Sequence, residues 1–244
     1  MEQRGVEREL VVDGQRRRYI LDVPAAALTR RPAPLLLDFH GFQHSAAGVW
    51  RVSEFKRLGA EKGFVTVYPQ GLPVNLLGRQ GDGWEIFTVV RNRDLRLVEE
   101  LIRDVSEEYC IDLRRVYATG FSNGGFLTHL LACHMADRIA GIAPVGAGMV
   151  DVPCKPAAPV AVIIHHGVRD ERVGIERAKA LGDRWRALNR CGPGEEKRAD
   201  GCVVAQNCVA GGQVVFCEAD LGHHWPAGAA DRIWEFFEGH ARRP

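Results

Sequence analysis

The chain has 244 residues, of which 46% are hydrophobic, and this length and composition allow one sizeable core. We expect a single α/β domain over residues 1–244, because folds of that class often reach this length undivided. The 32 basic and 31 acidic residues leave a formal net charge of +1, which argues against a protein that coats nucleic acid.

The first half of the chain alternates strand-like and helix-like segments. Residues 6–23 predict a β-hairpin with its turn at Asp13-Gly14, and residues 24–34 a connector. Apolar runs at 35–39 and 64–68 predict buried strands, with a helix over 49–62 between them. Residues 71–83 are rich in glycine and turn-forming residues, which indicates a loop. The apolar spacing from 95 to 105 predicts an amphipathic helix ending near residue 109.

The second half continues the alternation. A strand over 116–119 precedes a helix from 123, further strands are expected over 139–145, 160–165 and 213–218, and helices over 175–188 and 230–239. Strands that are apolar throughout and alternate with helices indicate a parallel sheet covered on both faces. The connector at 149–159 is too short for a large lid. We therefore expect a mostly parallel central sheet with an N-terminal antiparallel hairpin, helices on both faces and no large lid.

A serine stands between two glycines where the strand over 116–119 gives way to a helix. Gly120-Phe121-Ser122-Asn123-Gly124 fits the G-x-S-x-G nucleophile elbow, which requires this strand–turn–helix context. The elbow holds its serine in a strained backbone conformation, and glycine at the two flanking positions removes collisions with the neighbouring strand and helix. The alternative is a simple turn serine, but the context favours a nucleophile.

A serine nucleophile needs a base and an orienting acid, which in such sheets follow it in the order acid, then histidine. Asp170 lies just past the strand over 160–165, with Glu171 as the adjacent alternative. His223 and His224 follow the last strand, and only one of two adjacent side chains can reach Ser122. The sequence therefore predicts a triad with Asp170 as its acid.

Two backbone N–H groups are expected to form an oxyanion hole. One is that of Asn123, which follows the serine, and the other is that of Phe42 in the loop after the strand over 35–39, with Gln43 next to it. Trp84, Trp225 and Gln43 are the residues expected to contact substrate, although plain packing is an equal alternative for Trp84. His40 and His44 could be a metal pair, but no third ligand lies close by in the sequence, so no metal site is predicted.

Several segments together resemble the feruloyl esterase and polyhydroxybutyrate depolymerase (LpqC-like) family of α/β-hydrolases. The motifs that carry the resemblance are His40-Gly41, Tyr68-Pro69-Gln70-Gly71, Tyr109-Cys110-Ile111-Asp112, residues 115–120, Ser122-Asn123-Gly124-Gly125, His166-Gly167-x-x-Asp170 and Gly222-His223-His224-Trp225-Pro226. In the family the base is the histidine directly after the glycine, which is His223 here. The oxyanion loop departs from the polyhydroxybutyrate depolymerases, which more often have a cysteine after the glycine where this chain has Phe42.

The resemblance implies a serine carboxylic-ester hydrolase with Ser122, His223 and Asp170 as its triad and no cofactor. Its substrates would be feruloyl-type or other aromatic or short-chain acyl esters, free or borne on plant cell-wall polysaccharide. Polyester depolymerase and acetyl xylan esterase are alternatives, and acyl transfer to an alcohol is an alternative of another class. No nucleic acid and no membrane is expected as a partner.

Seven cysteines are many for a cytosolic enzyme. Four of them, Cys191, Cys202, Cys208 and Cys217, crowd into the last third, and without a CxxC pair they favour disulfides over a zinc site. Four cysteines allow three pairings, and the odd total leaves one thiol over. No apolar run reaches the ~20 residues of a membrane helix, and the start of the chain lacks a signal-peptide core. We expect a secreted or periplasmic protein whose signal is absent from this sequence; the alternative is cytoplasmic.

Overall fold

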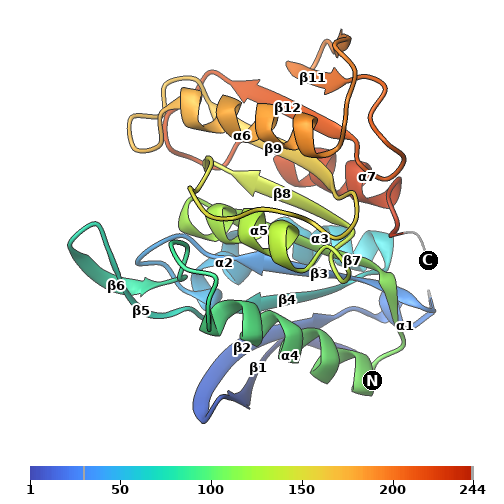
Figure 1. The fold of residues 1–244 in the computed structure, drawn as a ribbon. Coiled ribbons are helices and arrows are strands. Elements are labelled where there is room, and N and C mark those ends of the chain that lie inside the picture. The colour runs from blue at the N-terminus through green and yellow to red at the C-terminus, as the bar shows by residue number, and fades with distance from the viewer. Residues whose placement is uncertain (30, 243–244) are drawn as a thin grey trace.

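The sheet that organises the molecule is seen in Figure 1, drawn from a computed structural model that describes residues 1–29 and 31–242. Its strands in chain order are β1 (Gln3–Val12), β2 (Gln15–Val23), β3 (Ala33–Phe39), β4 (Val65–Pro69), β7 (Ile111–Phe121), β8 (Gly141–Val145), β9 (Ala161–Gly167), β10 (Glu195–Lys197), β11 (Cys202–Ala205) and β12 (Val214–Ala219). In space they lie in the order β1-β2-β4-β3-β7-β8-β9-β12-β11-β10. The central run from β4 to β12 is parallel, and both flanks are antiparallel.

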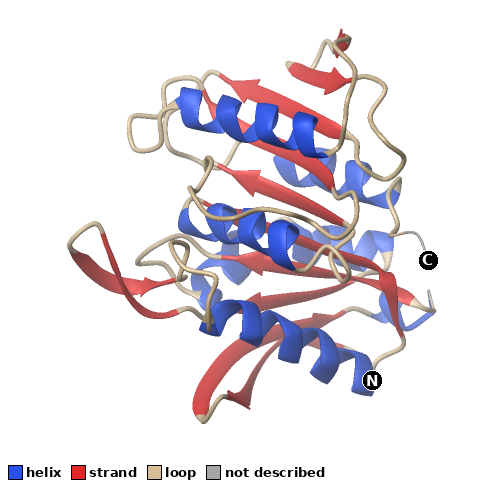
Figure 2. Cartoon of the chain, viewed as in Figure 1, coloured by secondary structure: helices blue, strands red, loops and turns tan. Residues whose placement is uncertain are grey.

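Helices cover both faces of this sheet (Figure 2). One face carries α4 (Arg93–Glu108), α5 (Asn123–His134) and α6 (Ile175–Leu188), and the other carries α2 (Ala46–Val52), α3 (Phe55–Lys62) and α7 (Ala229–Glu238). Strands β3, β8 and β9 are buried along their whole length, because side chains on both of their faces lie under helices. The predicted fold class, an α/β-hydrolase fold with a mostly parallel sheet and an N-terminal hairpin, is therefore confirmed.

Each helix face follows from its sequence spacing. In α4, Leu97, Val98, Leu101 and Ile102 are buried against the sheet. Asn92 begins that helix, since its side-chain oxygen accepts hydrogen bonds from the backbone nitrogens of Asp94 and Leu95.

The predicted helix over 49–62 is wrong in one respect, because the structure divides it into α2 and α3. Ser53 stands at the break, where its hydroxyl donates to Asp38 Oδ2 at 3.0 Å and its Oγ accepts from the backbone nitrogen of Phe55 at 3.2 Å. A serine bonded in this way offers the backbone an alternative to continuing the helix.

The predicted loop over 71–83 is also wrong. The segment forms a separate antiparallel hairpin of β5 (Leu72–Leu76) and β6 (Arg79–Gly83), which projects on the side where the parallel strands end (Figure 1). The short helix α1 (Ala25–Thr29) and the strands β10 and β11 are further elements that the sequence pattern did not indicate.

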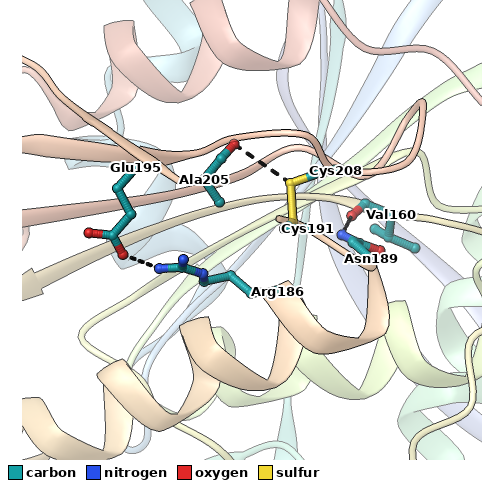
Figure 3. Close-up of a disulfide and its surroundings, with 7 residues drawn as sticks. All are labelled: Val160, Arg186, Asn189, Cys191, Glu195, Ala205 and Cys208. Carbon is teal, nitrogen blue, oxygen red and sulfur yellow. Dashed lines mark hydrogen bonds and ion pairs between the residues drawn. A yellow bond between two sulfur atoms is a disulfide. The ribbon is translucent and has the colours of Figure 1, made fainter. Parts of the chain in front are cut away.

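The cysteines form three disulfides, Cys133–Cys154, Cys191–Cys208 and Cys202–Cys217, which leave Cys110 as an exposed free thiol. The predicted disulfide-bonded C-terminal region is thus present in the structure. Figure 3 shows the surroundings of the Cys191–Cys208 bond, where Asn189 Nδ2 donates to the Val160 oxygen at 2.8 Å. Among the described residues, no helix is long and apolar enough to cross a membrane.

Candidate active site

Three polar side chains that are far apart in the sequence meet where the parallel strands end. Ser122 follows β7, Asp170 follows β9, and His223 follows β12. Because the carboxyl ends of parallel strands share one edge of a sheet, their following loops converge there.

Ser122 occupies a strained backbone conformation between β7 and α5, with φ 53° and ψ −117°. Both flanking residues must be glycine, because neighbouring backbone atoms leave no room for a Cβ. A Cβ added at Gly120 would lie 2.6 Å from the carbonyl carbon of Gly124, and one at Gly124 would lie 2.2 Å from the Phe39 oxygen. Both contacts are to backbone, which cannot move aside, so the turn that presents the hydroxyl depends on both glycines.

The imidazole of His223 lies between the other two groups. Its Nε2 is 2.9 Å from Ser122 Oγ, and its Nδ1 is 2.6 Å from Asp170 Oδ2. A carboxylate only accepts, so Nδ1 carries the proton and Nε2 is left to accept from the serine hydroxyl. His224, the alternative base, is exposed, as is Glu171, the alternative acid.

Asp170 is held in place by several donors. Its Oδ1 accepts from the backbone nitrogens of Arg172 and Val173, each at 2.9 Å. Burial alone would raise the pKa of this carboxyl, but the hydrogen bonds from His223 and from the two backbone groups outweigh it, so the pKa is lowered. The carboxyl is thereby kept ionised beside the imidazole.

His166 is a neighbour of this group that the sequence did not single out. Its ring is buried, and Nε2 donates to the Val173 oxygen at 2.7 Å and lies 3.5 Å from Asp170 Oδ2. The ring therefore supports the turn whose amides bind Asp170. The sequence offered one indication of this role, because His166 stands four residues before Asp170 in the motif His166-Gly167-x-x-Asp170.

Trp84 lies elsewhere than predicted. Only 1% of its side chain is exposed, its indole nitrogen donates to the His40 oxygen at 2.7 Å, and it does not line the cavity beside Ser122. Trp225 is also absent from the cavity wall and packs edge-on against Phe55. Trp84 is thus a packing residue, whereas Trp225 is half-buried, and neither ring lies in the cavity wall where a substrate contact was predicted.

His40 is a buried loop anchor rather than half of a metal pair. Its Nε2 accepts from the Gly71 nitrogen at 2.9 Å, so Nδ1 carries the proton and donates to the Gly41 oxygen at 2.7 Å. Burial lowers the pKa of His40, which keeps the ring neutral. The ring thus ties the loop after β3 to the start of the β5–β6 hairpin.

The two predicted oxyanion residues, Phe42 and Asn123, both line the cavity together with Ser122. Among the described residues, the Gln43 nitrogen donates to the Asp82 oxygen at 2.8 Å and the Ser122 nitrogen to the Val145 oxygen at 2.8 Å, so neither is free. The amides of Phe42 and Asn123 make no such bond within the described chain. Of the two candidates in this loop, the structure therefore favours Phe42 over Gln43 as a free donor.

A cavity of about 420 Å³ opens beside Ser122 and His223. This volume is in the range of sites for small organic ligands. Its apolar wall comprises Phe42, Leu76, Leu77, Ile86, Phe87, Phe126 and Val173. Gln43, one of the residues expected to contact substrate, also lines it, and Phe87 and Phe126 are wall residues that the sequence analysis did not name. Phe126 lies one helical turn after Ser122, and that spacing could have indicated it.

A group of potential metal ligands lies away from this cavity. Within the described residues, ligand atoms of His129, Cys133 and Cys154 lie within 4.8 Å of one another. The two sulfurs are bonded to each other, so neither is the thiolate that a metal would require.

Comparisons with known proteins point to esterases. No family model matches the chain. It is 27% identical over 244 residues to feruloyl esterase B of Piromyces equi, covering 90% of this chain and 44% of that protein. It is 26% identical to feruloyl esterase D of Neurospora crassa, covering 93% and 83%. The acetyl xylan esterase of Aspergillus awamori superposes with a TM-score of 0.73 at 15% identity, covering 96% of this chain and 99% of that one.

The chain has an α/β-hydrolase fold and is similar in sequence to feruloyl esterases. The resemblance expected from the sequence motifs is thereby confirmed, and the relatives are carboxylic-ester hydrolases. The chain spans less than half of the Piromyces protein and 22% of a bifunctional acetylxylan esterase/xylanase of Neocallimastix patriciarum, to which it is 29% identical over 159 residues.

Proposed function

We propose that this protein is a serine carboxylic-ester hydrolase with Ser122 as nucleophile, His223 as base and Asp170 as the orienting acid. The observation that carries the proposal is the position of His223, with Nε2 2.9 Å from Ser122 Oγ and Nδ1 2.6 Å from Asp170 Oδ2. A nucleophile within hydrogen-bond reach of a base that a third group orients is the geometry of acyl transfer.

The reaction proceeds through an acyl-enzyme. His223 takes the proton of Ser122 as Oγ attacks the ester carbonyl carbon, and the backbone N–H groups of Phe42 and Asn123 stabilise the oxyanion. The alcohol leaves with the proton from His223. Water then gives a proton to the same imidazole, attacks the acyl carbonyl and releases the acid, restoring Ser122.

The substrate that fits the cavity best is an ester of a hydroxycinnamic or similar aromatic acid. The phenyl rings of Phe42, Phe87 and Phe126 line it, and offset ring contacts add roughly 0.5–1.5 kcal/mol beyond the burial of apolar surface. The names of the relatives support the same class, because the Piromyces and Neurospora proteins are feruloyl esterases. Polysaccharide-borne acetyl esters and short polyesters are alternatives within the same chemistry.

The three disulfides support an extracellular or periplasmic place of action, since such bonds persist in oxidising compartments.

The proposal is tested with a fluorophosphonate probe and a panel of esters. We expect Ser122 to be labelled, and Ser122→Ala and His223→Ala to lose at least about 10³-fold in kcat. His224→Ala is the matched control because that side chain is exposed next to the base. The panel comprises methyl ferulate, acetylated xylan and hydroxybutyrate oligomers. Each ester is assayed with and without an added acceptor alcohol. Full activity of His223→Ala contradicts the assignment, and partition of the acyl group to the alcohol over water would make the protein an acyltransferase.

A further inference from the structure

The cavity beside Ser122 carries an uncompensated positive charge. Arg79 of β6, Arg172 after β9 and Arg177 of α6 line it, and no aspartate or glutamate of the described chain does. The protein as a whole has 32 basic and 31 acidic residues. The excess of positive charge at this site is therefore local and does not follow from the composition of the chain.

Two arginines that do not line the cavity are paired with carboxylates. Arg93 pairs with Glu85 at 3.3 Å, and Arg169 pairs with Asp220 at 2.9 Å. Within the described residues, Arg79, Arg172 and Arg177 form no ion pair with a carboxylate. The three guanidinium groups at the cavity are thus left without a paired carboxylate, unlike those of Arg93 and Arg169.

Two of these arginines are positioned by uncharged partners. Arg79 Nη2 donates to Gln43 Oε1 at 3.1 Å, in the predicted oxyanion loop. Arg177 Nη2 donates to the Met149 oxygen at 3.3 Å, and its guanidinium lies 5.3 Å from the ring centre of Phe126. Neutral partners leave the positive charge of both arginines unneutralised. The contact with the Phe126 ring also keeps the planar guanidinium of Arg177 oriented.

We infer that the substrate carries a carboxylate in addition to its ester, and that Arg79, Arg172 and Arg177 recognise it. The inference rests on the proposed ester hydrolysis at Ser122. A guanidinium binds a carboxylate through two parallel hydrogen bonds, and a site lined by one sign of charge concentrates ligands of the other. The substrate class is an anionic ester, whose charge belongs either to the acyl part, as in a half-ester of a dicarboxylic acid, or to the alcohol part, as in an acidic sugar.

The test compares charged and neutral esters in pairs. Methyl 4-carboxycinnamate against methyl 4-methoxycinnamate places the charge on the acyl part, and 4-carboxyphenyl acetate against 4-acetylphenyl acetate places it on the alcohol part. For each pair the ratio of kcat/KM, charged over neutral, is measured in the wild type and in Arg79→Gln and Arg177→Gln. Intrinsic reactivity cancels when these ratios are compared between variants.

We expect each substitution to lower the ratio for one of the two pairs by about three- to tenfold, the size of a single exposed or half-exposed charge contact. Arg177→Lys, which keeps the charge, should recover part of the loss. Raising the salt concentration from 0.05 to 0.5 M should lower the wild-type ratio, since exposed charges are screened. The pair that responds identifies which part of the substrate bears the carboxylate.

Arg190→Gln is the matched control, because that exposed arginine lies beyond the last residue of α6, at the opposite end of the helix from Arg177. The inference is overturned if the kcat/KM ratios of Arg79→Gln and Arg177→Gln match those of Arg190→Gln for both pairs and the wild-type ratio does not change with salt. In that case, hydrolysis of the neutral esters still supports the proposed function. Failure to hydrolyse any of the four esters, together with no labelling of Ser122, would overturn both.

Discussion

The side chain of Asn123 holds the backbone of Trp84 from both of its polar groups. Asn123 Oδ1 accepts from the Trp84 nitrogen at 2.7 Å, and Nδ2 donates to the Trp84 oxygen at 3.2 Å. The Trp84 indole in turn donates to the His40 oxygen. A chain of buried hydrogen bonds therefore joins the residue after Ser122 to the loop that presents Phe42, and it fixes the spacing of the two proposed oxyanion donors.

Asn123→Ala should lower kcat by up to about a hundredfold with a smaller change in KM, because small displacements of a catalytic group are costly. It should also lower the free energy of unfolding by about 1–3 kcal/mol, since two buried backbone groups lose their partners. Kinetics and denaturant unfolding measure both effects. Asn189→Ala is the control, because it removes a buried bond to Val160 away from the site; an equal loss of kcat there would contradict the prediction.

Phe87→Ala should reduce kcat/KM for methyl ferulate by roughly three- to tenfold and that for an acetyl ester by less, since only the aromatic acyl group contacts the ring. Phe87 is 58% exposed, so its removal leaves the core intact. Trp84→Phe is the comparison and should lower both rates alike, because it removes the bond to His40 rather than a substrate contact. Equal losses of kcat/KM for methyl ferulate and for the acetyl ester in Phe87→Ala would show that this ring does not contact the acyl group.

Asp38 should make the protein less stable as the pH rises from about 4 to 7. Burial raises the pKa of this carboxyl to about 7, although the Ser53 hydroxyl partly opposes the rise. The unfolded pKa is about 3.9, so within that window the folded protein holds a proton that the unfolded chain has released. The free energy of unfolding therefore falls with rising pH.

Asp38→Asn removes this dependence. We expect its free energy of unfolding, relative to the wild type, to increase by about 2–3 kcal/mol between pH 5 and pH 8, at ~1.4 kcal/mol per pH unit up to the folded pKa. Denaturant unfolding at both pH values measures the change, and Asp151→Asn, at an exposed position, provides the control. If the free energy of unfolding differs between variant and wild type by the same amount at pH 5 and at pH 8, the pKa of Asp38 is not raised in the folded protein.

Replacing Cys191 and Cys208 together by serine should lower the free energy of unfolding by about 3 kcal/mol and Tm by roughly 6–12 °C. The bond closes a loop with a sequence separation of 17, which restricts the unfolded chain. Cys110→Ser, at the free exposed thiol, should leave Tm unchanged. Calorimetry of the two variants makes the comparison, and matching Tm values would contradict a stabilising role.

The sequence indicated the features that depend on neighbouring residues. Ser122 between Gly120 and Gly124 can be read locally because the steric need for glycine extends only two residues either way. The β5–β6 hairpin could not be read in this way. Its turn has positive φ at Leu77 and Gly78, 52° and 83°, and leucine does not indicate the left-handed position that asparagine or glycine usually occupies.

Trp84 shows a second limit. Its backbone is held by Asn123, which lies 39 residues along the chain, and an aromatic residue beside a loop gives no sign of which way it will turn. The roles of Ser122, Asp170 and His223 stay predictions that the labelling and kinetic experiments address.

The β5–β6 hairpin pairs only with itself, yet Leu76, Leu77 and Arg79 reach the cavity beside Ser122. Its tip can therefore be exchanged for that of a relative without interrupting a strand that carries catalytic machinery. We therefore expect a library confined to residues 76–79 to change substrate selectivity while leaving the residues proposed for catalysis in place.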